Sequence, residues 1–146
     1  VFLGEEDVSD AIRTQDISIA ASNVSAVPQV RAFLFDLQRD LAKTNHVVMD
    51  GRDIGTVVLP HAQVKIFLTA SPEERARRRY EELLEKGMEA DYEQVLAELK
   101  QRDYDDSHRA VAPLVPADDS ILVDSTGLTR EEALQRLLKT VQEKLS

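Results

Sequence analysis

The sequence contains no cysteine, which excludes disulfides, thiolate metal sites and a cysteine nucleophile and is compatible with a reducing cytoplasm. No apolar run approaches the roughly 18 residues of a membrane-spanning helix, and no charged-then-apolar signal segment opens the chain. The histidines, His46, His61 and His108, lack metal-ligand spacing, and no Gly-x-Ser-x-Gly elbow occurs. We therefore expect a soluble cytoplasmic protein with no metal ligands of its own, no membrane partner and no acyl-transfer chemistry.

Basic residues are in the minority, because 18 Lys and Arg stand against 27 Asp and Glu, with a net charge of −9 and a pI near 4.8. This balance argues against a general nucleic-acid binder, which needs a basic surface. Any phosphate ligand must be met by a local arginine cluster. The 146 residues, 42% of them hydrophobic, can bury one core and carry a small lobe. The chain begins with Val1 rather than Met, so we expect an upstream portion to be missing.

Short apolar runs alternate with helical periodicity, a pattern that predicts an α/β fold with a parallel sheet. Core strands are predicted at 47–49, 64–68 and 121–123, and a further strand at 1–3 whose hairpin partner lies upstream. Helices are predicted at 15–26, from Pro28 to Asn45 with a buried apolar stripe, and over 71–87, 91–102 and 129–145. Capping boxes are expected at two helix starts, namely Ser71 with Glu74 and Thr129 with Glu132.

The segment 50–56, Asp-Gly-Arg-Asp-Ile-Gly-Thr, directly follows the strand predicted at 47–49. In open α/β sheets, ligands bind at the carboxyl ends of the strands. The two glycines allow a sharp bend and a close backbone approach, and Arg52 offers a planar fork for phosphate between Asp50 and Asp53. The alternative is an ordinary strand-to-loop turn with solvated charges.

Arginines concentrate at 75–79, where they occupy four of five positions. Arg75, Arg78 and Arg79 share a helical face at i, i+3 and i+4, and such a face can gather phosphate oxygens. The alternative is a solvated helix that carries i, i+4 ion pairs, here Glu74–Arg78, Arg77–Glu81 and Arg78–Glu82.

A second pattern of this kind lies downstream, where Arg102, Asp106 and Arg109 fall at i, i+4 and i+7 and would line one side of a continuing helix. Arginines that bind phosphate bidentately, around an aspartate that accepts hydrogen bonds from sugar hydroxyls, suit a nucleoside monophosphate. A surface ion-pair ladder is the alternative. Ser22 and Arg31 indicate little by themselves, since such residues are usually structural.

Taken together and in this order, these segments resemble the bacterial cytidylate kinase family over essentially all 146 residues. The likeness is carried by 22–31, 50–56, 75–79, 102–110 and 112–114. It implies a P-loop nucleoside monophosphate kinase-like fold, in which helices flank a parallel sheet and a monophosphate-binding lobe faces an arginine-bearing lid. It also implies a monomeric intact enzyme that uses Mg²⁺ and transfers the γ-phosphoryl group of ATP to CMP or dCMP.

The resemblance assigns roles to residues by position. Those that match recognition of the cytosine edge are Ser22, Arg31 and Asp53. Those that match phosphate and sugar contacts are Asp50, Arg52, Arg102, Asp106 and Arg109. Those in the lid region that would cover the ATP phosphates are Arg75, Arg78 and Arg79, and the sequence does not say which of them points inward.

The chain departs from the family at the P-loop, which needs two glycines with the second followed by Lys and Ser or Thr. None of the five glycines here precedes a lysine. The resemblance places the ATP cradle, the first core strand and another arginine upstream of Val1. We expect the central P-loop strand to be absent between the strands at 47–49 and 64–68, which leaves unpaired edges. The chain alone should then be inactive, and should either show a gap, closure or swapped pairing there or self-associate.

The resemblance also predicts how the chain is organised. We expect the tail of the monophosphate-binding insertion lobe at 1–23, core at 24–71, the lid region and following helix at 72–112, and the core C-terminal strand and helix at 113–146. The predicted function is that of a cytidylate kinase fragment whose intact parent uses CMP, dCMP and ATP. The alternatives are a kinase for another pyrimidine monophosphate and a non-catalytic nucleotide-binding or assembly module.

Overall fold

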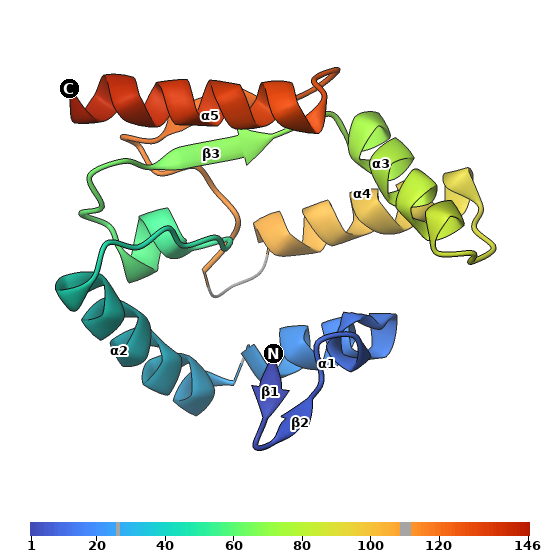
Figure 1. The fold of residues 1–146 in the computed structure, drawn as a ribbon, viewed down its shortest axis with the longest axis horizontal. Coiled ribbons are helices and arrows are strands. Elements are labelled where there is room, and N and C mark those ends of the chain that lie inside the picture. Colours follow the sequence, from blue (N-terminus) through green and yellow to red (C-terminus); the bar gives the residue numbers. More distant parts are fainter. Residues whose placement is uncertain (26, 109–111) are drawn as a thin grey trace. The chain divides into compact units, whose positions relative to one another are not determined.

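The computed structural model describes residues 1–25, 27–108 and 112–146 and contains two compact units, Val1–Val48 and Met49–Ser146 (Figure 1). The boundary between these units falls inside the segment 24–71 that was expected as core, and the four-part division of the sequence stays a prediction. Within the described ranges, no helix combines the length and the apolar content needed to cross a bilayer.

The first unit opens with a small hairpin in which β1 (Phe2–Leu3) pairs antiparallel with β2 (Glu6–Asp7). Gly4 turns the chain with a φ of 63°, a conformation that glycine adopts without steric cost. The turn at Gly4 brings a downstream strand beside the first strand, and the expected upstream partner stays a prediction. The remaining elements of this unit are η1 (Ala11–Arg13), α1 (Gln15–Ser25) and α2 (Pro28–Thr44).

Helix α2 begins and ends where the sequence predicts. Pro28 occupies its first position, where the missing N–H has no helical partner to lose. Asn45 caps the other end, and its side-chain amide donates to the carbonyl oxygen of Leu41 at 3.1 Å. The prediction that its apolar stripe is buried is wrong in this structure, since Phe33 is 71% exposed and Leu37 47% exposed.

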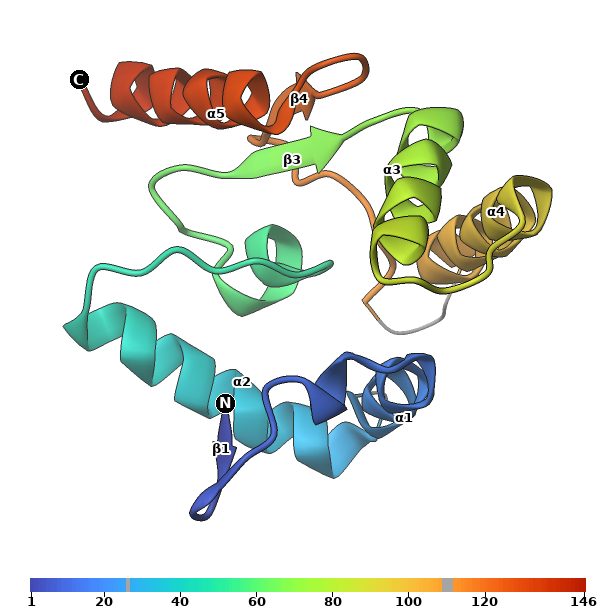
Figure 2. The same cartoon turned by 45° about the vertical axis from the view of Figure 1, so that its right-hand side comes forward.

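The second unit is α/β, and its sheet consists of two parallel strands, β3 (Ile66–Thr69) and β4 (Ile121–Asp124). The register places Ile66 opposite Ile121. Helix α5 (Arg130–Leu145) lies alongside this strand pair in both views (Figures 1 and 2). Two of the three predicted core strands and their parallel pairing are thus confirmed.

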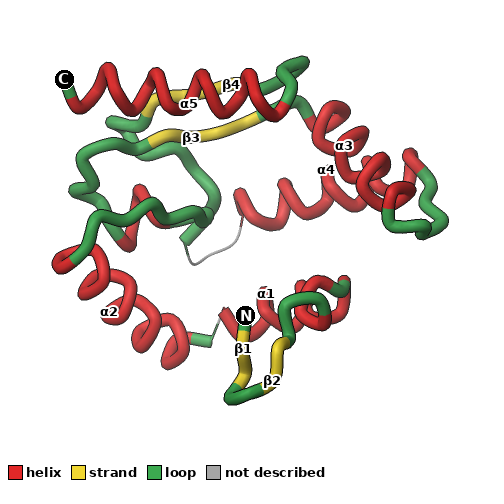
Figure 3. The backbone as a smooth tube through the Cα atoms, viewed as in Figure 1, coloured by secondary structure: helices red, strands yellow, loops and turns green. Residues whose placement is uncertain are grey.

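Helices α3 (Pro72–Glu85) and α4 (Tyr92–His108) pack against each other after the chain leaves the carboxyl end of β3 (Figure 3). Their contact includes the rings of Tyr80 and Tyr92, which meet edge to face with centroids 6.1 Å apart. Helix α4 runs six residues beyond the predicted end at Arg102, so it continues through Asp106 as the spacing of its charged residues requires.

The predicted capping boxes form to different extents. At α5 both halves are present, because the Thr129 hydroxyl accepts the Glu132 N–H at 3.2 Å and the Glu132 carboxylate accepts the Thr129 N–H at 2.8 Å. At α3 the Ser71 hydroxyl accepts the Glu74 N–H at 3.2 Å, but the Glu74 carboxylate bonds to arginines one turn later instead of returning to the cap.

The strand predicted at 47–49 does not form, and Val48 is fully exposed. A strand requires a neighbour for its N–H and C=O groups, and the parallel pairing found in the described part of the chain joins β3 to β4. The apolar side chains buried in the described residues are few and mostly small, namely Val58, Ala70, Ala76 and Val123. Leu68 of β3 and Leu122 of β4 are 53% and 64% exposed, so one face of each strand is open.

Candidate functional site

The loop after residue 49 is shaped by close packing. Residues 50–53 lead into η2 (Ile54–Val58), a π-helical turn that the sequence did not predict, in which the Asp53 carbonyl accepts two backbone N–H groups at 2.9 and 3.1 Å. A Cβ added at Gly51 would lie 2.8 Å from Cγ1 of Ile54, so a larger residue would force a shift. Asp53 is only 9% exposed, which fixes this carboxylate in the body of the unit.

Three of the predicted phosphate and sugar residues meet beside this loop. Arg52 Nε donates to Oδ2 of Asp106, 54 residues further along the chain. Nε of Arg102, one turn earlier in α4, lies 4.0 Å from the same oxygen. The Asp106 side chain is 16% exposed, against 39% for Arg52 and 58% for Arg102. Two guanidinium groups thus share one carboxylate, so this Arg52–Asp106–Arg102 cluster keeps a positive charge within an acidic protein.

The structure gives less information on the other residues that were predicted to bind the acceptor nucleotide. Asp50 is exposed at the start of the loop. Arg109 lies outside the described residues, and so does the side chain of Ser22. Ser22 and Arg31 belong to the first unit, and their convergence with Asp53 of the second unit stays a prediction.

Arg75 of the lid set is bound to α4. Its Nη1 and Nη2 donate to the two carboxylate oxygens of Asp103 at 2.9 and 2.6 Å, and its Nε donates to the carbonyl of Ala70 at 3.0 Å. The hydrogen bonds to Asp103 are the main reason that the pKa of Arg75 is raised above its ordinary value. Arg75 therefore joins the carboxyl end of β3 to both helices that follow it.

The other two lid arginines have different partners. Arg78 donates to the carbonyl oxygens of Ser125 at 2.7 Å and Leu128 at 3.3 Å, so it holds α3 against the segment between β4 and α5. Arg79 pairs with Glu82 of its own helix at 2.8 Å. The lid role of these arginines stays a prediction, and the structure shows that they serve different contacts.

The alternative interpretation of 75–79 as a helix with i, i+4 ion pairs is also partly confirmed. Two of the three pairs form, Glu74–Arg78 at 2.9 Å and Arg77–Glu81 at 2.8 Å. The third does not, because Glu82 accepts from Arg79 and Lys86. Hydrogen bonds from Arg77 are the main reason that the pKa of Glu74 lies below its ordinary value, and the hydrogen bond from Arg78 adds to this effect.

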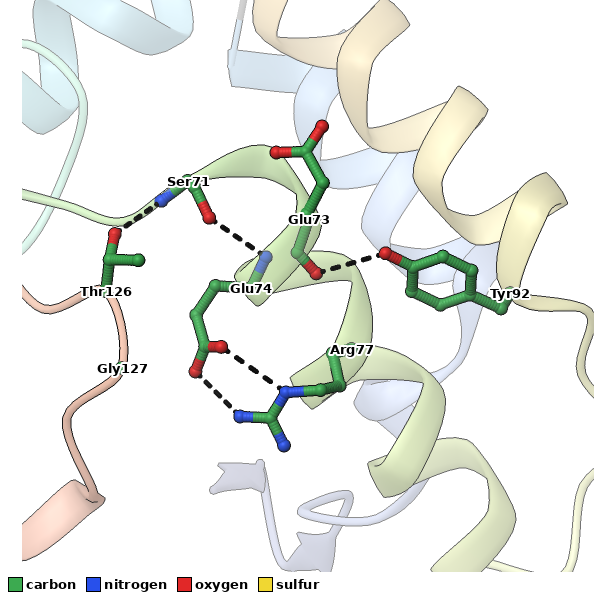
Figure 4. Close-up of a pocket in the computed structure, with 7 residues that line it drawn as sticks. All are labelled: Ser71, Glu73, Glu74, Arg77, Tyr92, Thr126 and Gly127. Carbon is green, nitrogen blue, oxygen red and sulfur yellow. Dashed lines mark hydrogen bonds and ion pairs between the residues drawn. The ribbon is translucent and has the colours of Figure 1, made fainter.

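A shallow hollow opens where α3 begins (Figure 4), and its lining contains none of the predicted site residues. The residues around it are Ser71, Glu73, Glu74, Arg77, Tyr92, Thr126 and Gly127. Figure 4 shows the Glu74 carboxylate turned toward Arg77, and the Ser71 N–H donating to the Thr126 hydroxyl at 2.9 Å. Because these polar groups bond to one another, we interpret the hollow as a packing contact between α3 and the segment after β4, and not as a ligand site.

Sequence reasoning missed the partners that fix the arginines. Asp103 and Ser125 carried no local signal, because their contacts with Arg75 and Arg78 join residues 28 and 47 positions apart. Lys65 was also missed; its side chain is 8% exposed, and its Nζ contacts Asp119 at 2.5 Å and the carbonyl of Pro60 at 2.6 Å. The methylene groups of Lys65 also pack against the loop, since a Cβ at Gly55 would lie 3.3 Å from Lys65 Cδ.

Comparison with known proteins shows the family to which the chain is similar. A family profile described as "Cytidylate kinase" matches residues 1–143. A protein named "Cytidylate kinase" from Mannheimia succiniciproducens is 52% identical over 145 residues, which are 99% of this chain and 64% of the relative. Those of Streptococcus equi subsp. equi and Caldicellulosiruptor saccharolyticus are 53% identical over 144 residues and 56% identical over 139 residues. These matches cover 99% and 95% of this chain and 62% of each relative.

The chain therefore spans 62–64% of the length of these relatives. The range matched by the family profile, residues 1–143, contains the loop at 50–53 and helices α3 and α4. The chain belongs to the cytidylate kinase family.

Proposed function

We propose that the full-length protein transfers the γ-phosphoryl group of ATP to CMP or dCMP, and that this chain supplies most of the acceptor site. The observation that carries the proposal is the Arg52–Asp106–Arg102 cluster. Its residues come from a loop and a helix that are 50 or more positions apart in the sequence, since Arg52 Nε donates to an Asp106 oxygen 54 residues further along.

The cluster suits the phosphate of a nucleoside monophosphate. Arg52 uses Nε to bond to Asp106, and its terminal nitrogens are left in the fork geometry that matches phosphate oxygens. Arg102 is the most exposed of the three residues and lies 4.0 Å from the shared carboxylate oxygen, so a phosphate group can draw it in. In this proposal Asp106 holds the two arginines close together and accepts a hydrogen bond from a sugar hydroxyl.

Phosphoryl transfer depends on positioning and on charge stabilisation more than on covalent chemistry of the protein. The two arginines would fix the attacking phosphate oxygen of CMP and offset the negative charge that accumulates as donor and acceptor approach. Arg31, Ser22 and Asp53 are proposed to read the cytosine edge, where the exocyclic amine requires an acceptor and the ring nitrogen and carbonyl require donors.

The donor side is represented by Arg75, Arg78 and Arg79 and lacks a P-loop sequence, since no glycine precedes a lysine. No group of three His, Asp or Glu side chains in the described part of the chain could hold a metal ion. In this proposal Mg²⁺ enters with the donor substrate, as MgATP. We further propose that the remaining third of the full-length protein supplies the P-loop and the strand that would pair beside β3.

The proposal is tested by measuring phosphorylation of CMP, dCMP, UMP and AMP by the full-length protein. CMP and dCMP should be used best. Arg31→Met should lower CMP turnover by about 10²-fold, because the polar edge of cytosine would be left without one of its hydrogen-bond donors. Preference for UMP would favour a kinase for another pyrimidine monophosphate. Nucleotide binding without turnover of any acceptor would favour a non-catalytic module.

A further inference from the structure

Helix α4 supplies two of the three residues of the Arg52–Asp106–Arg102 cluster, called the acceptor cluster below. The position of α4 depends on the elements against which it packs. Its neighbour α3 is held firmly on the strand pair. The Ser71 N–H donates to the Thr126 hydroxyl at 2.9 Å, and Arg78 donates to the Ser125 carbonyl at 2.7 Å. Ala76 of α3 is completely buried. Helix α3 is therefore a fixed support for α4.

Three sets of polar or aromatic contacts join α4 to this support. At the start of α4, the Tyr92 hydroxyl lies 3.5 Å from the carbonyl of Glu73, and its ring meets that of Tyr80. In the middle, Lys100 pairs with Glu73 at 2.9 Å, with both side chains more than half exposed. The third is the bidentate pair of Arg75 and Asp103, whose side chains are 34% and 36% exposed.

The Arg75–Asp103 pair is the contact closest to the acceptor cluster. Asp103 follows Arg102 directly and precedes Asp106 by three residues, which corresponds to about 4.5 Å along a helix. Residues three apart are separated by about 60° around the axis of a helix, so they turn together but can reach different partners. The carboxylate of Asp103 therefore binds α3 while that of Asp106 binds Arg52, and a rotation of α4 that broke one contact would move the other.

The geometry of the pair supports a positioning role. Arg75 is restrained from two directions, because its Nε bonds to the Ala70 carbonyl at 3.0 Å while both terminal nitrogens bond to Asp103. A single exposed ion pair often contributes little to stability. A bidentate pair whose arginine is also fixed by a backbone carbonyl defines one orientation of the partner helix, which is the property that a binding site needs.

We propose that Asp103, through its pair with Arg75, is a positioning residue for the acceptor site, because it sets the rotation of α4 at which Arg102 and Asp106 face Arg52. This inference rests on the proposed function. It gives Arg75, which lies in the arginine-rich start of α3, an effect on the acceptor nucleotide as well as any effect on ATP.

The test uses full-length protein carrying Asp103→Asn, which keeps the shape of the side chain and removes its charge. Asp105→Asn is the matched control, since it removes the same charge two residues away, where the carboxylate accepts a hydrogen bond from Gln101 of the same helix at 2.9 Å. We expect Asp103→Asn to raise KM for CMP about 10-fold, because a small misplacement of binding groups weakens acceptor binding. KM for ATP and kcat at saturating CMP should stay within about twofold, and the control should resemble the parent.

A second set of variants tests whether the two residues act together. Arg75→Gln should raise KM for CMP as Asp103→Asn does, and the double variant should be no worse than the poorer single variant. The exchange Arg75→Asp with Asp103→Arg should recover part of the loss. An unchanged KM for CMP in Asp103→Asn, equal rises in the KM values for CMP and ATP, or an equal effect of Asp105→Asn would overturn the proposal.

A structural readout separates this inference from the proposed function. Amide hydrogen exchange over residues 100–108 should be faster in Asp103→Asn than in Asp105→Asn, because the end of α4 loses its tie to α3. If the parent protein phosphorylates no nucleoside monophosphate, the proposed function fails while the exchange result still tests the tie. Equal exchange in the two variants would show that Asp103 does not position α4.

Discussion

Replacing Arg78 with Met should destabilise the protein more than the same change at its neighbour Arg77. Arg78 joins α3 to the segment after β4, because it donates to the Ser125 carbonyl at 2.7 Å and also pairs with Glu74 at 2.9 Å. Arg77 pairs with Glu74 and with Glu81, both on its own helix. The two arginines are adjacent in the sequence and equal in charge, so the comparison isolates the contact with the strand end.

The contacts of the two arginines determine how much unfolding free energy each variant should lose. A hydrogen bond from a charged donor contributes about 1.5–3 kcal/mol. The Arg78 side chain is 39% exposed, and the Ser125 carbonyl also accepts the Leu128 N–H at 3.1 Å, so we take the lower end for the Ser125 bond. With about 0.5 kcal/mol for the longer bond to Leu128, the expected loss is about 2 kcal/mol. Arg77 is 52% exposed, and its helical pairs contribute about 0.3–0.5 kcal/mol each, so its loss stays below about 1 kcal/mol.

Thermal and urea unfolding of the full-length variants measure this difference. For a domain of 150–250 residues, 1 kcal/mol corresponds to about 2–4 °C in Tm, so Arg78→Met should lower Tm by about 4–8 °C and Arg77→Met by less than about 4 °C. Equal decreases in Tm in the two variants would refute the role of Arg78 in joining α3 to the segment after β4. An unchanged Tm for Arg78→Met together with a raised KM for ATP would show that Arg78 acts on the donor nucleotide instead.

Three further predictions follow from single contacts. Thr129→Ala should lower the free energy of unfolding by about 1 kcal/mol in urea titrations, because the capping box of α5 is lost, whereas Thr129→Ser should retain most of it. The pKa of Asp119 is lowered mainly by the hydrogen bond from Lys65, so the ionised carboxylate stabilises the fold above its ordinary pKa of 3.8 and this contribution disappears as the pH falls through the lower folded-state pKa. Melting curves from about pH 6 to pH 2.5 should therefore show a smaller acid-induced fall in Tm for Asp119→Asn than for the parent. Residues 1–146 alone should give no CMP phosphorylation with ATP and should associate in sedimentation experiments, and a stable monomer that turns over CMP would contradict this expectation.

Features that depend on neighbouring residues were predicted well from the sequence. The capping box at Thr129 and Glu132, the start of α2 at Pro28 and the end of α3 before Gly87 all depend on contacts within a few residues. The strand at 47–49 was not predicted correctly, because its apolar composition cannot supply a neighbouring strand. The same dependence on distant partners explains why the apolar stripe of α2 was expected to be buried and is found exposed.

The sequence predicted which residues form the acceptor cluster but not which of them contact one another. The spacing of Arg102 and Asp106 places them on one side of a helix, and the structure adds Arg52 from a loop 54 residues away from Asp106. The sequence gives no role to Asp103, and one more acid beside a phosphate site is unfavourable. Its bidentate pair with Arg75 resolves the difficulty, because that carboxylate faces a guanidinium of α3.

The proposed phosphate site lies in a protein with a net charge of −9, and the distribution of ion pairs gives that site a local excess of positive charge. Around α3 the positive charges are balanced locally, as for Arg75 with Asp103 and Arg79 with Glu82. Beside the loop at 50–53, Arg52 and Arg102 instead share the one carboxylate of Asp106. An anion entering there gains two guanidinium contacts and meets a site whose arginines are already held close together, so less ordering is needed on binding. The acidic surface elsewhere disfavours nucleic acid without weakening this local site, because screening limits interactions between exposed charges to about 8–10 Å.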